Sequence, residues 1–308
     1  MADTVLHIIE PGLLTTVQDS GRPGWARYGI PASGPMDRDA YHAANALVRN
    51  APHAGALEIT LTGPDIVISD DCLVAVCGAE FELFAGSLPV PTWHAVYLRR
   101  GDHFRFGMRH RGARAIVAVS GGIDVPLFLG SRSTFLNGGF GGYHGRALQR
   151  GDQLLVGKNE NKDLVMAAGS SWAHNKRPRY SASPVIRVVL GPQADYFDPP
   201  VVALFSQHTY TISAASNRMG FRLAGPALVH KGATGIVSDG IVTGSIQVPP
   251  DGQPIVMMVD HQTTGGYPKI ATVVQADIPL LAQCLPGDSI QFRVISVDEA
   301  YRMFTCRV

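Results

Sequence analysis

The sequence has 308 residues, enough for one large domain or two smaller ones that each bury a hydrophobic core. Its 26 Lys and Arg residues balance 25 Asp and Glu residues, so we expect neither a nucleic-acid-binding nor a membrane-surface protein, which would need clustered positive charge. Charged residues make up only 17% of the chain, and the 34 Gly and 21 Pro residues indicate short strands joined by sharp turns.

Short strands outnumber helices among the predicted elements. The strands are rich in β-branched residues, and the helices show apolar residues at helical spacing or a Pro after an N-cap. In chain order the sequence predicts a helix over 36–50, strands over 65–69, 72–76, 115–119, 153–156 and 185–190, a helix over 198–205, a strand over 255–259, a helix over 278–283 and a strand over 290–295. We therefore expect a mainly β fold with a few short helices.

The two halves of the chain share an order of turns and strands. Leu61-Thr-Gly-Pro64 and the turn Arg100-Gly-Asp102 have counterparts in Leu223-Ala-Gly-Pro226 and Pro286-Gly-Asp288. Each Gly-Asp pair alone is ordinary turn chemistry, but the ordered recurrence predicts two related β-barrel halves. We expect these halves over residues 1–160 and 185–308, joined by a polar linker over residues 161–184.

Several kinds of protein and site are excluded by what the sequence lacks. No apolar run approaches the roughly 20 residues that cross a bilayer, and no basic segment followed by an apolar one opens the chain, so we expect a cytoplasmic protein. The P-loop, zinc-protease and α/β-hydrolase motifs are absent. We expect no metal site, and we interpret the scattered cysteines as core or surface thiols: Cys72, Cys77, Cys284 and Cys306.

A glycine-rich segment is the first candidate site. Residues 137–146 and the preceding 130–134 offer backbone N–H groups, hydroxyls and two arginines, Arg132 and Arg146, which are able to bind a carboxylate or phosphate in bidentate fashion. The alternative is a loop packed against a neighbouring segment, with both arginines bonded to carbonyl groups. The sequence leaves both interpretations open.

The second candidate site, residues 260–269, is a connection that is longer and more polar than a hairpin turn requires. Asp260 is able to orient or deprotonate a substrate, Gln262 to bond an amide, and Lys269 to neutralise developing negative charge. We expect His261 to face solvent, because strand alternation places it opposite Asp260.

A third candidate site combines Arg218 with Asp239. Structurally, the segments around these residues are predicted to be turns and edge strands. Functionally, a folded barrel could bring this cation and this carboxylate to the same rim, although their spacing in the sequence does not establish that they meet.

Six motifs resemble those of one known family over roughly Leu6 to Ile295. The motifs are Gly12–Gly24, Pro31–Asp37, Gly130–Thr134, Ser216–Gly220, Gln247–Pro254 and Asp260–Lys269. The chain resembles the family named biotin-dependent carboxyltransferase or allophanate hydrolase subunit 2. This resemblance implies a pair of cyclophilin-like β-barrels, in agreement with the two halves predicted above.

The resemblance also implies a function. Members of the family include the C subunit of the ATP-dependent bacterial 5-oxoprolinase, and one half of the carboxyltransferase domain of urea carboxylase. Similarity to the 5-oxoprolinase subunit implies cleavage of 5-oxoproline to L-glutamate with ATP as co-substrate. It also implies a complex with a KipI-like B-type subunit and a LamB/YcsF-like A-type subunit. The alternatives are carboxyl transfer from biotin to urea or a similar amide, and a non-enzymatic, KipA-like antagonist of a kinase inhibitor. The biotin-attachment motif Met-Lys-Met is absent, so we expect no covalent biotin on this chain.

The implied chemistry is consistent with the candidate residues. A lactam resists hydrolysis because its nitrogen lone pair is delocalised into the carbonyl group, so a site that cleaves it needs cations and hydrogen-bond donors around the amide. We expect Arg132, Arg146, Arg218 and Asp239 to bind substrate or phosphate groups. We expect the catalytic groups around the amide to be Asp260, Gln262, Tyr267 and Lys269.

Overall fold

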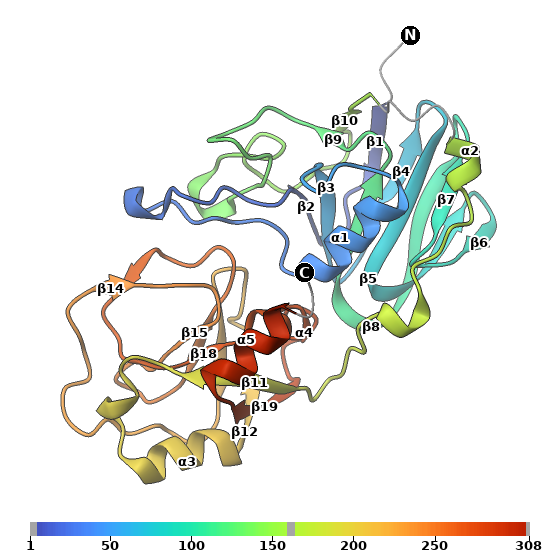
Figure 1. The fold of residues 1–308 in the computed structure, drawn as a ribbon. Helices are drawn as coiled ribbons and strands as arrows, with labels where there is room; N and C mark the ends of the chain where they lie inside the picture. The colour runs from blue at the N-terminus through green and yellow to red at the C-terminus, as the bar shows by residue number, and fades with distance from the viewer. Residues whose placement is uncertain (1–4, 159–163, 306–308) are drawn as a thin grey trace. The chain divides into compact units, whose positions relative to one another are not determined.

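The computed structural model describes residues 5–158 and 164–305. The chain divides into two compact units, one formed by residues 1–22 and 33–179 and the other by residues 23–32 and 180–308. Strands dominate both units (Figure 1). The predicted mainly β fold with two barrel-like sheets and a few short helices is therefore confirmed.

The first unit is organised around the long strand β8 (His103–Val119). One edge of β8 pairs with β5 (Cys72–Ala85), and the other pairs with β4 (Asp65–Ile68) and β3 (Ala56–Thr60). The other elements of this unit are β1 (Val5–Glu10), β2 (Leu14–Gln18), α1 (Arg38–Leu47), β6 (Leu88–Val90), β7 (Ala95–Leu98), β9 (Ile123–Asp124), η2 (Leu136–Gly138), β10 (Gln153–Val156), α2 (Leu164–Ala167) and η3 (His174–Lys176).

Strands β5 and β8 are much longer than the predicted strands 72–76 and 115–119. The first part of β8 contains exposed Arg and His side chains in place of a β-branched run, so sequence pattern does not reveal it. The register of the β5–β8 pair shifts at three places between Gly78 and Leu83, which bends this long ribbon. The ribbon's buried side chains, with those of β1, β3 and β4, form the core of the first unit.

Helix α1 confirms the helix predicted over 36–50, with shorter bounds. The Asp37 carboxylate accepts a hydrogen bond from the Ala40 N–H at 2.9 Å, so Asp37 is the N-cap and the helix starts at Arg38. The helix ends at Leu47, and Arg49 adopts a left-handed conformation with φ of 57°.

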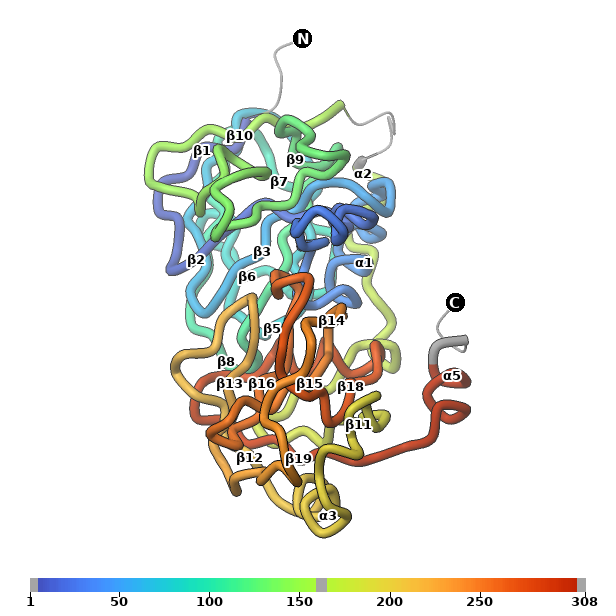
Figure 2. Tube along the Cα trace, turned by 90° about the vertical axis from the view of Figure 1, so that its left-hand side faces the viewer, coloured from blue at the N-terminus to red at the C-terminus, as the bar shows by residue number. Residues whose placement is uncertain are grey.

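The second unit is a closed barrel of seven strands in the order β11-β18-β15-β16-β13-β12-β19 (Figure 2). Strands β11 and β19 pair in parallel, and the other barrel neighbours are antiparallel. The barrel strands are β11 (Val185–Leu190), β12 (Thr209–Ile212), β13 (Gly220–Ala224), β15 (Ser245–Gln247), β16 (Ile255–Met257), β18 (Lys269–Val273) and β19 (Ser289–Val294). A separate two-stranded sheet consists of β14 (Asp239–Gly240) and β17 (Thr264–Gly265).

Short helices complete the second unit and confirm two predicted ones. Helix α3 (Pro199–Gln207) follows the predicted N-cap Asp198, and α4 (Ile278–Ala282) covers most of the predicted 278–283. The other elements are η1 (Ala26–Tyr28), η4 (Ala194–Tyr196), η5 (Gln275–Asp277) and α5 (Val297–Thr305).

The recurring Gly-Asp pairs form the same turn in both units. In each turn the Asp carboxylate accepts a hydrogen bond from the backbone N–H three residues earlier, and the Gly has a φ near +90°. The bonds are Arg99 to Asp102 at 2.8 Å, Gln149 to Asp152 at 2.7 Å and Leu285 to Asp288 at 2.8 Å, with φ of 87°, 87° and 92° at Gly101, Gly151 and Gly287. The turn chemistry predicted from the sequence is confirmed.

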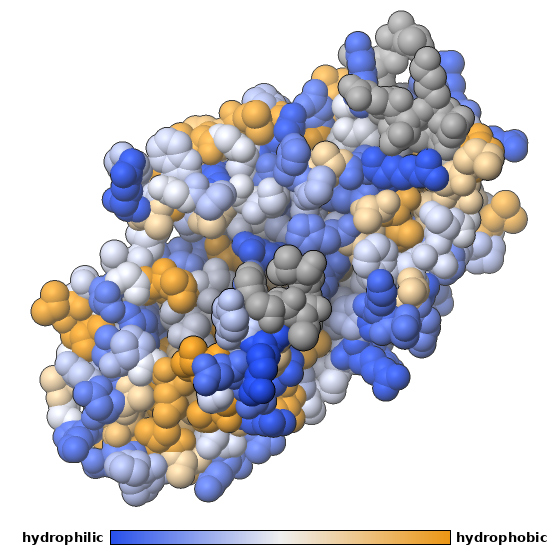
Figure 3. Space-filling model, in the orientation of Figure 1, coloured by the Kyte–Doolittle hydropathy of each residue, from blue (hydrophilic) through white to orange (hydrophobic). Residues whose placement is uncertain are grey.

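On the face drawn in Figure 3, hydrophobic groups gather mainly in the lower left part, with hydrophilic groups between them. Among the described residues, no helix is both long and apolar enough to cross a membrane.

Cys72, Cys77 and Cys284 are buried free thiols, and burial raises the pKa of Cys72 to about 12. Cys306 and the linker residues 161–163 lie outside the described residues.

Candidate functional site

A buried ion pair joins Arg218 and Asp260 in the second unit. Arg218 donates to the two Asp260 carboxylate oxygens, from Nε at 2.7 Å and from Nη2 at 3.3 Å, and both side chains are less than a tenth exposed. Strand pairing places them together, because the Asp260 N–H donates to the Arg218 carbonyl at 2.9 Å, just beyond the paired ends of β13 and β16. A bidentate pair of this kind fixes the orientation of both groups.

A second ion pair joins Lys269, at the start of β18, to Asp239 in β14. Lys269 Nζ donates to Asp239 Oδ2 at 2.5 Å and to the Gly240 carbonyl at 2.9 Å. The Lys269 side chain is only 5% exposed, whereas that of Asp239 is 53% exposed. The Lys269 ammonium and the Gly240 N–H hold the pKa of the Asp239 carboxyl below its usual range.

Two glutamines, Gln193 and Gln247, lie beside Lys269, and a third, Gln262, lies beside Gln247. Gln262 Nε2 lies 3.4 Å from Gln247 Oε1, and Gln193 Oε1 accepts a hydrogen bond from the Lys269 N–H at 3.3 Å. Gln247 is fully buried, and its Nε2 has no hydrogen-bond partner among the described residues. A Cβ on Gly265 would lie 2.5 Å from that nitrogen, so glycine is needed there for Gln247 to keep its position.

The structure corrects one expectation for this segment and places one further residue. His261 is buried and does not face solvent, because β16 ends at Met257 and a turn follows, in which the His261 N–H donates to the Met258 carbonyl. Burial lowers the pKa of His261, so the ring is neutral at neutral pH. Tyr267 is 42% exposed, so a ligand is able to reach its side chain.

Arg132 and Arg146 both lie in the first unit and both bind internal carboxylates. Arg132 Nη2 donates to Asp124 at 2.9 Å, and its backbone N–H donates to the buried Asp19. Arg146 donates to both Asp152 carboxylate oxygens, from Nη1 at 2.7 Å and from Nη2 at 2.8 Å. These hydrogen bonds keep the pKa of the Asp152 carboxyl below its usual range. Arg146 therefore binds a carboxylate of the protein itself, and its expected role in binding a substrate or phosphate group stays a prediction.

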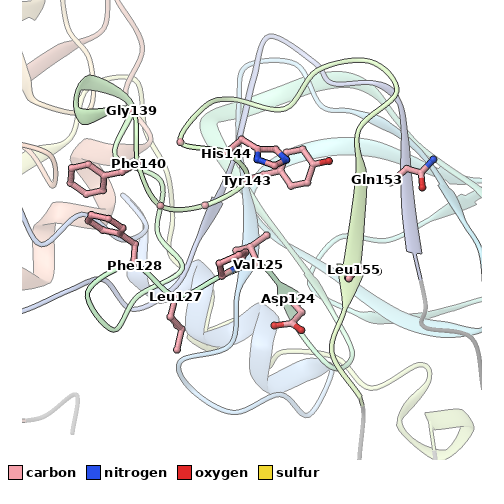
Figure 4. Close-up of a pocket in the computed structure, with 14 residues that line it drawn as sticks. Asp124, Val125, Leu127, Phe128, Gly139, Phe140, Tyr143, His144, Gln153 and Leu155 are labelled. Atoms are coloured by element: carbon pink, nitrogen blue, oxygen red, sulfur yellow. The ribbon is translucent and has the colours of Figure 1, made fainter.

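The glycine-rich loop lines a pocket of about 400 Å³ in the first unit (Figure 4). Tyr143 and His144 border it on the loop side, Asp124 and Val125 come from the end of β9 and the residue after it, and Leu155 comes from β10. Arg132 and Arg146 do not line this pocket. The loop keeps its path because residues 141 and 142 are glycines with φ of 70° and 56°, and a Cβ on either would collide with residues 133 or 134.

The structure thus groups the predicted residues into two sets. Arg218, Asp239, Asp260, Gln262 and Lys269 all lie in the second unit and are hydrogen-bonded to one another or to neighbours there, whereas Arg132 and Arg146 belong to the first unit. Two polar neighbours, Gln193 and Gln247, were not predicted from the sequence as site residues. Gln247 begins one of the six motifs, but burial of a lone amide is visible only in three dimensions.

The second-unit residues carry no net charge as a group, since two cations are matched by two carboxylates. Among the described residues, no group of three or more His, Cys, Asp or Glu side chains is arranged to hold a metal ion. The set is suited to a small polar molecule, which it could contact through an ammonium group and amides without a large excess of charge.

Comparisons with known proteins agree with these observations. The family described as "Carboxyltransferase domain, subdomain A and B" matches residues 28–294. The C subunit of the 5-oxoprolinase of Escherichia coli (strain K12) is 39% identical over 301 residues, which cover 97% of this chain and 94% of that protein. The corresponding protein of Haemophilus influenzae is 34% identical over 304 residues, with the same coverage of both chains.

A solved structure shows the same fold in a larger protein. The urea amidolyase of K. lactis superposes with a TM-score of 0.91 at 31% identity, over 99% of this chain. The match spans only 20% of the urea amidolyase chain.

Proposed function

The chain belongs to the family of carboxyltransferase domains with subdomains A and B, and from this we propose that it is the C subunit of an ATP-dependent 5-oxoprolinase. The observation that carries the proposal is the similarity to two such subunits over 94% of their lengths. In this proposal the chain cleaves 5-oxoproline to L-glutamate only within a complex. Its partners are a KipI-like B-type subunit and a LamB/YcsF-like A-type subunit.

We assign the lactam site to the cluster around Lys269 in the second unit. Attack of water on the lactam carbonyl places negative charge on its oxygen, and the Lys269 ammonium is able to neutralise that charge. The Gln262 amide and the Tyr267 hydroxyl, both on exposed residues, are available to hydrogen-bond the lactam. Asp260 is held in place by Arg218, which donates to both carboxylate oxygens and so orients this side chain.

The same cluster does not fit the triphosphate of ATP. Each of its two cations is matched by a carboxylate, so it offers no excess positive charge to a group with several negative charges. We therefore place the ATP site on a partner protein or on residues completed by one. Because the lactam site and the ATP site would then lie on different proteins, we expect the chain to be inactive alone.

Reconstitution of the complex tests the proposal. The chain is mixed with purified A-type and B-type subunits, and glutamate and ADP are measured after addition of 5-oxoproline and ATP. We expect both products only when all three proteins are present. A mixture that is inert towards both substrates, but in which this chain sequesters the B-type subunit, would instead support the non-enzymatic antagonist.

A second candidate function is carboxyl transfer from biotin to urea or a similar amide. The family description and the structural similarity to a urea amidolyase favour it. It predicts that activity requires a biotin-carrying protein and is abolished by avidin. Activity with 5-oxoproline in the presence of avidin would exclude this candidate.

A further inference from the structure

An exposed arm, residues 231–241, carries the carboxylate that neutralises Lys269. The arm contains β14, which pairs with β17 outside the barrel. Most of its residues are exposed, and Val237 is 92% exposed. A Cβ on Gly232 or Gly240 would have no neighbour within 4 Å, so the arm packs loosely at these positions.

Few bonds hold the arm to the rest of its unit. Its backbone donates from Ile236 to the Gly266 carbonyl at 2.8 Å and from Ile241 to the Thr263 carbonyl at 3.0 Å. Where the arm begins, the Lys231 N–H donates to the Tyr196 carbonyl at 2.8 Å. Lys269 provides a further attachment, because its Nζ bonds to Asp239 and to the Gly240 carbonyl, both in the arm. A buried ammonium therefore anchors the arm near its end.

We propose that Lys269 Nζ is an oxyanion-binding site, that the Asp239 carboxylate occupies it in the resting protein, and that a ligand oxyanion displaces Asp239 and releases the arm. The ligand chemistry is a carboxylate or phosphate oxygen. This inference rests on the proposed function, in which Lys269 must release Asp239 before it neutralises the oxyanion that forms on the lactam carbonyl of 5-oxoproline.

The burial of the two partners decides which one moves. Lys269 is enclosed and lies on a barrel strand, so its ammonium cannot leave without losing charge compensation. Asp239 is half exposed and becomes hydrated when the arm moves away, which costs little. Exchange of one oxyanion for another leaves the charge around Lys269 unchanged, so a ligand can replace Asp239 without an unpaired buried cation.

Hydrogen exchange and anion titration on the full isolated chain test the inference. Peptides covering 231–241 are followed by mass spectrometry with sodium phosphate or sodium 5-oxoprolinate, and affinities for both are measured by calorimetry. We expect the ligand that binds to accelerate exchange in the arm. In the Asp239→Asn variant we expect hydrogen exchange in the arm to be fast even without an anion. The anion that binds the wild type should bind this variant about tenfold more tightly, because the Asp239 carboxylate no longer competes for Lys269. The two titrations tell a phosphate site from a carboxylate site.

Two further variants make the result decisive. Lys269→Gln should abolish binding of both anions, whereas Asp298→Asn, an exposed carboxylate on α5, should behave as the wild type. Equal affinities in wild type and Asp239→Asn, slower arm exchange with the anion, or no binding of either anion would each overturn the inference. If the three-subunit complex cleaves 5-oxoproline but hydrogen exchange in the arm does not rise with the anion, only this inference is rejected. If exchange in the arm rises with the anion but the complex does not cleave 5-oxoproline, only the proposed function is rejected.

Discussion

Arg218 and Asp260 stand 42 residues apart in the chain and form a bidentate ion pair in the second unit. Their backbones are joined as well, by the hydrogen bond from the Asp260 N–H to the Arg218 carbonyl. Side chains and main chain thus connect the segment before β13 to the segment after β16. Asp260 begins the segment that ends at Lys269, so this pair fixes one end of the candidate site.

Removal of one partner of this pair should strongly destabilise the second unit. Arg218→Met leaves the Asp260 carboxylate buried without its cation, and we expect a loss of about 3–5 kcal/mol in the free energy of unfolding. Urea unfolding followed by circular dichroism measures this loss. The double variant Arg218→Met/Asp260→Leu should recover most of it, because no buried charge remains.

An exposed ion pair in the same unit provides the control. Arg293→Met breaks a pair with Glu299 whose N–O distance is 3.5 Å, and we expect a change below about 1 kcal/mol. A cost for Arg218→Met no larger than that control would contradict the structural role of the buried pair.

Loss of the Lys269 ammonium should reduce turnover in the assembled complex. Because this group is proposed to neutralise the developing oxyanion, Lys269→Ala should lower kcat for 5-oxoproline cleavage by about 10²–10³-fold. Steady-state kinetics with ATP in excess measures the effect, and Lys176→Ala, at an exposed position of η3, is the matched control. Full ATP-coupled turnover by Lys269→Ala would reject this role.

Gly265 should be required for the geometry of the site more than for stability. A Cβ there would lie 2.5 Å from Gln247 Nε2 and 2.7 Å from Ile241 Cδ1, both at the ends of flexible side chains that are able to shift. We therefore expect Gly265→Ala to change the free energy of unfolding by less than about 1 kcal/mol and to lower turnover through displacement of Gln247. Gly240→Ala in the paired strand, where a Cβ has no neighbour within 4 Å, should leave both quantities near wild type.

The Arg146–Asp152 pair predicts a pH-dependent contribution to stability in the first unit. Arg146 lowers the folded-state pKa of Asp152, so the pair's contribution is complete above the unfolded value of about 3.9 and is lost as the pH falls through the lower folded value. The difference in free energy of unfolding between wild type and Arg146→Gln should therefore shrink from about pH 6 to about pH 3. Urea unfolding across this range checks it, and a difference that does not change with pH would contradict the prediction.

Local sequence signals predicted the elements whose formation depends on neighbouring residues. The three Gly-Asp turns use hydrogen bonds between residues three apart, and α3 begins at Pro199 directly after Asp198, so both were visible as short patterns. The first part of β8 escaped prediction because its exposed, charged residues form a strand only through pairing with β4 and β5.

The sequence by itself determined the family, the mainly β fold and which residues are candidates for chemistry, because these depend on motifs and on local propensity. Only the tertiary structure decided which charges meet. Arg218 binds Asp260 and Lys269 binds Asp239, while Arg132 and Arg146 bind carboxylates of the first unit. The physical reason is that ion pairing and burial depend on distance in space, which strand pairing sets between residues far apart in the chain.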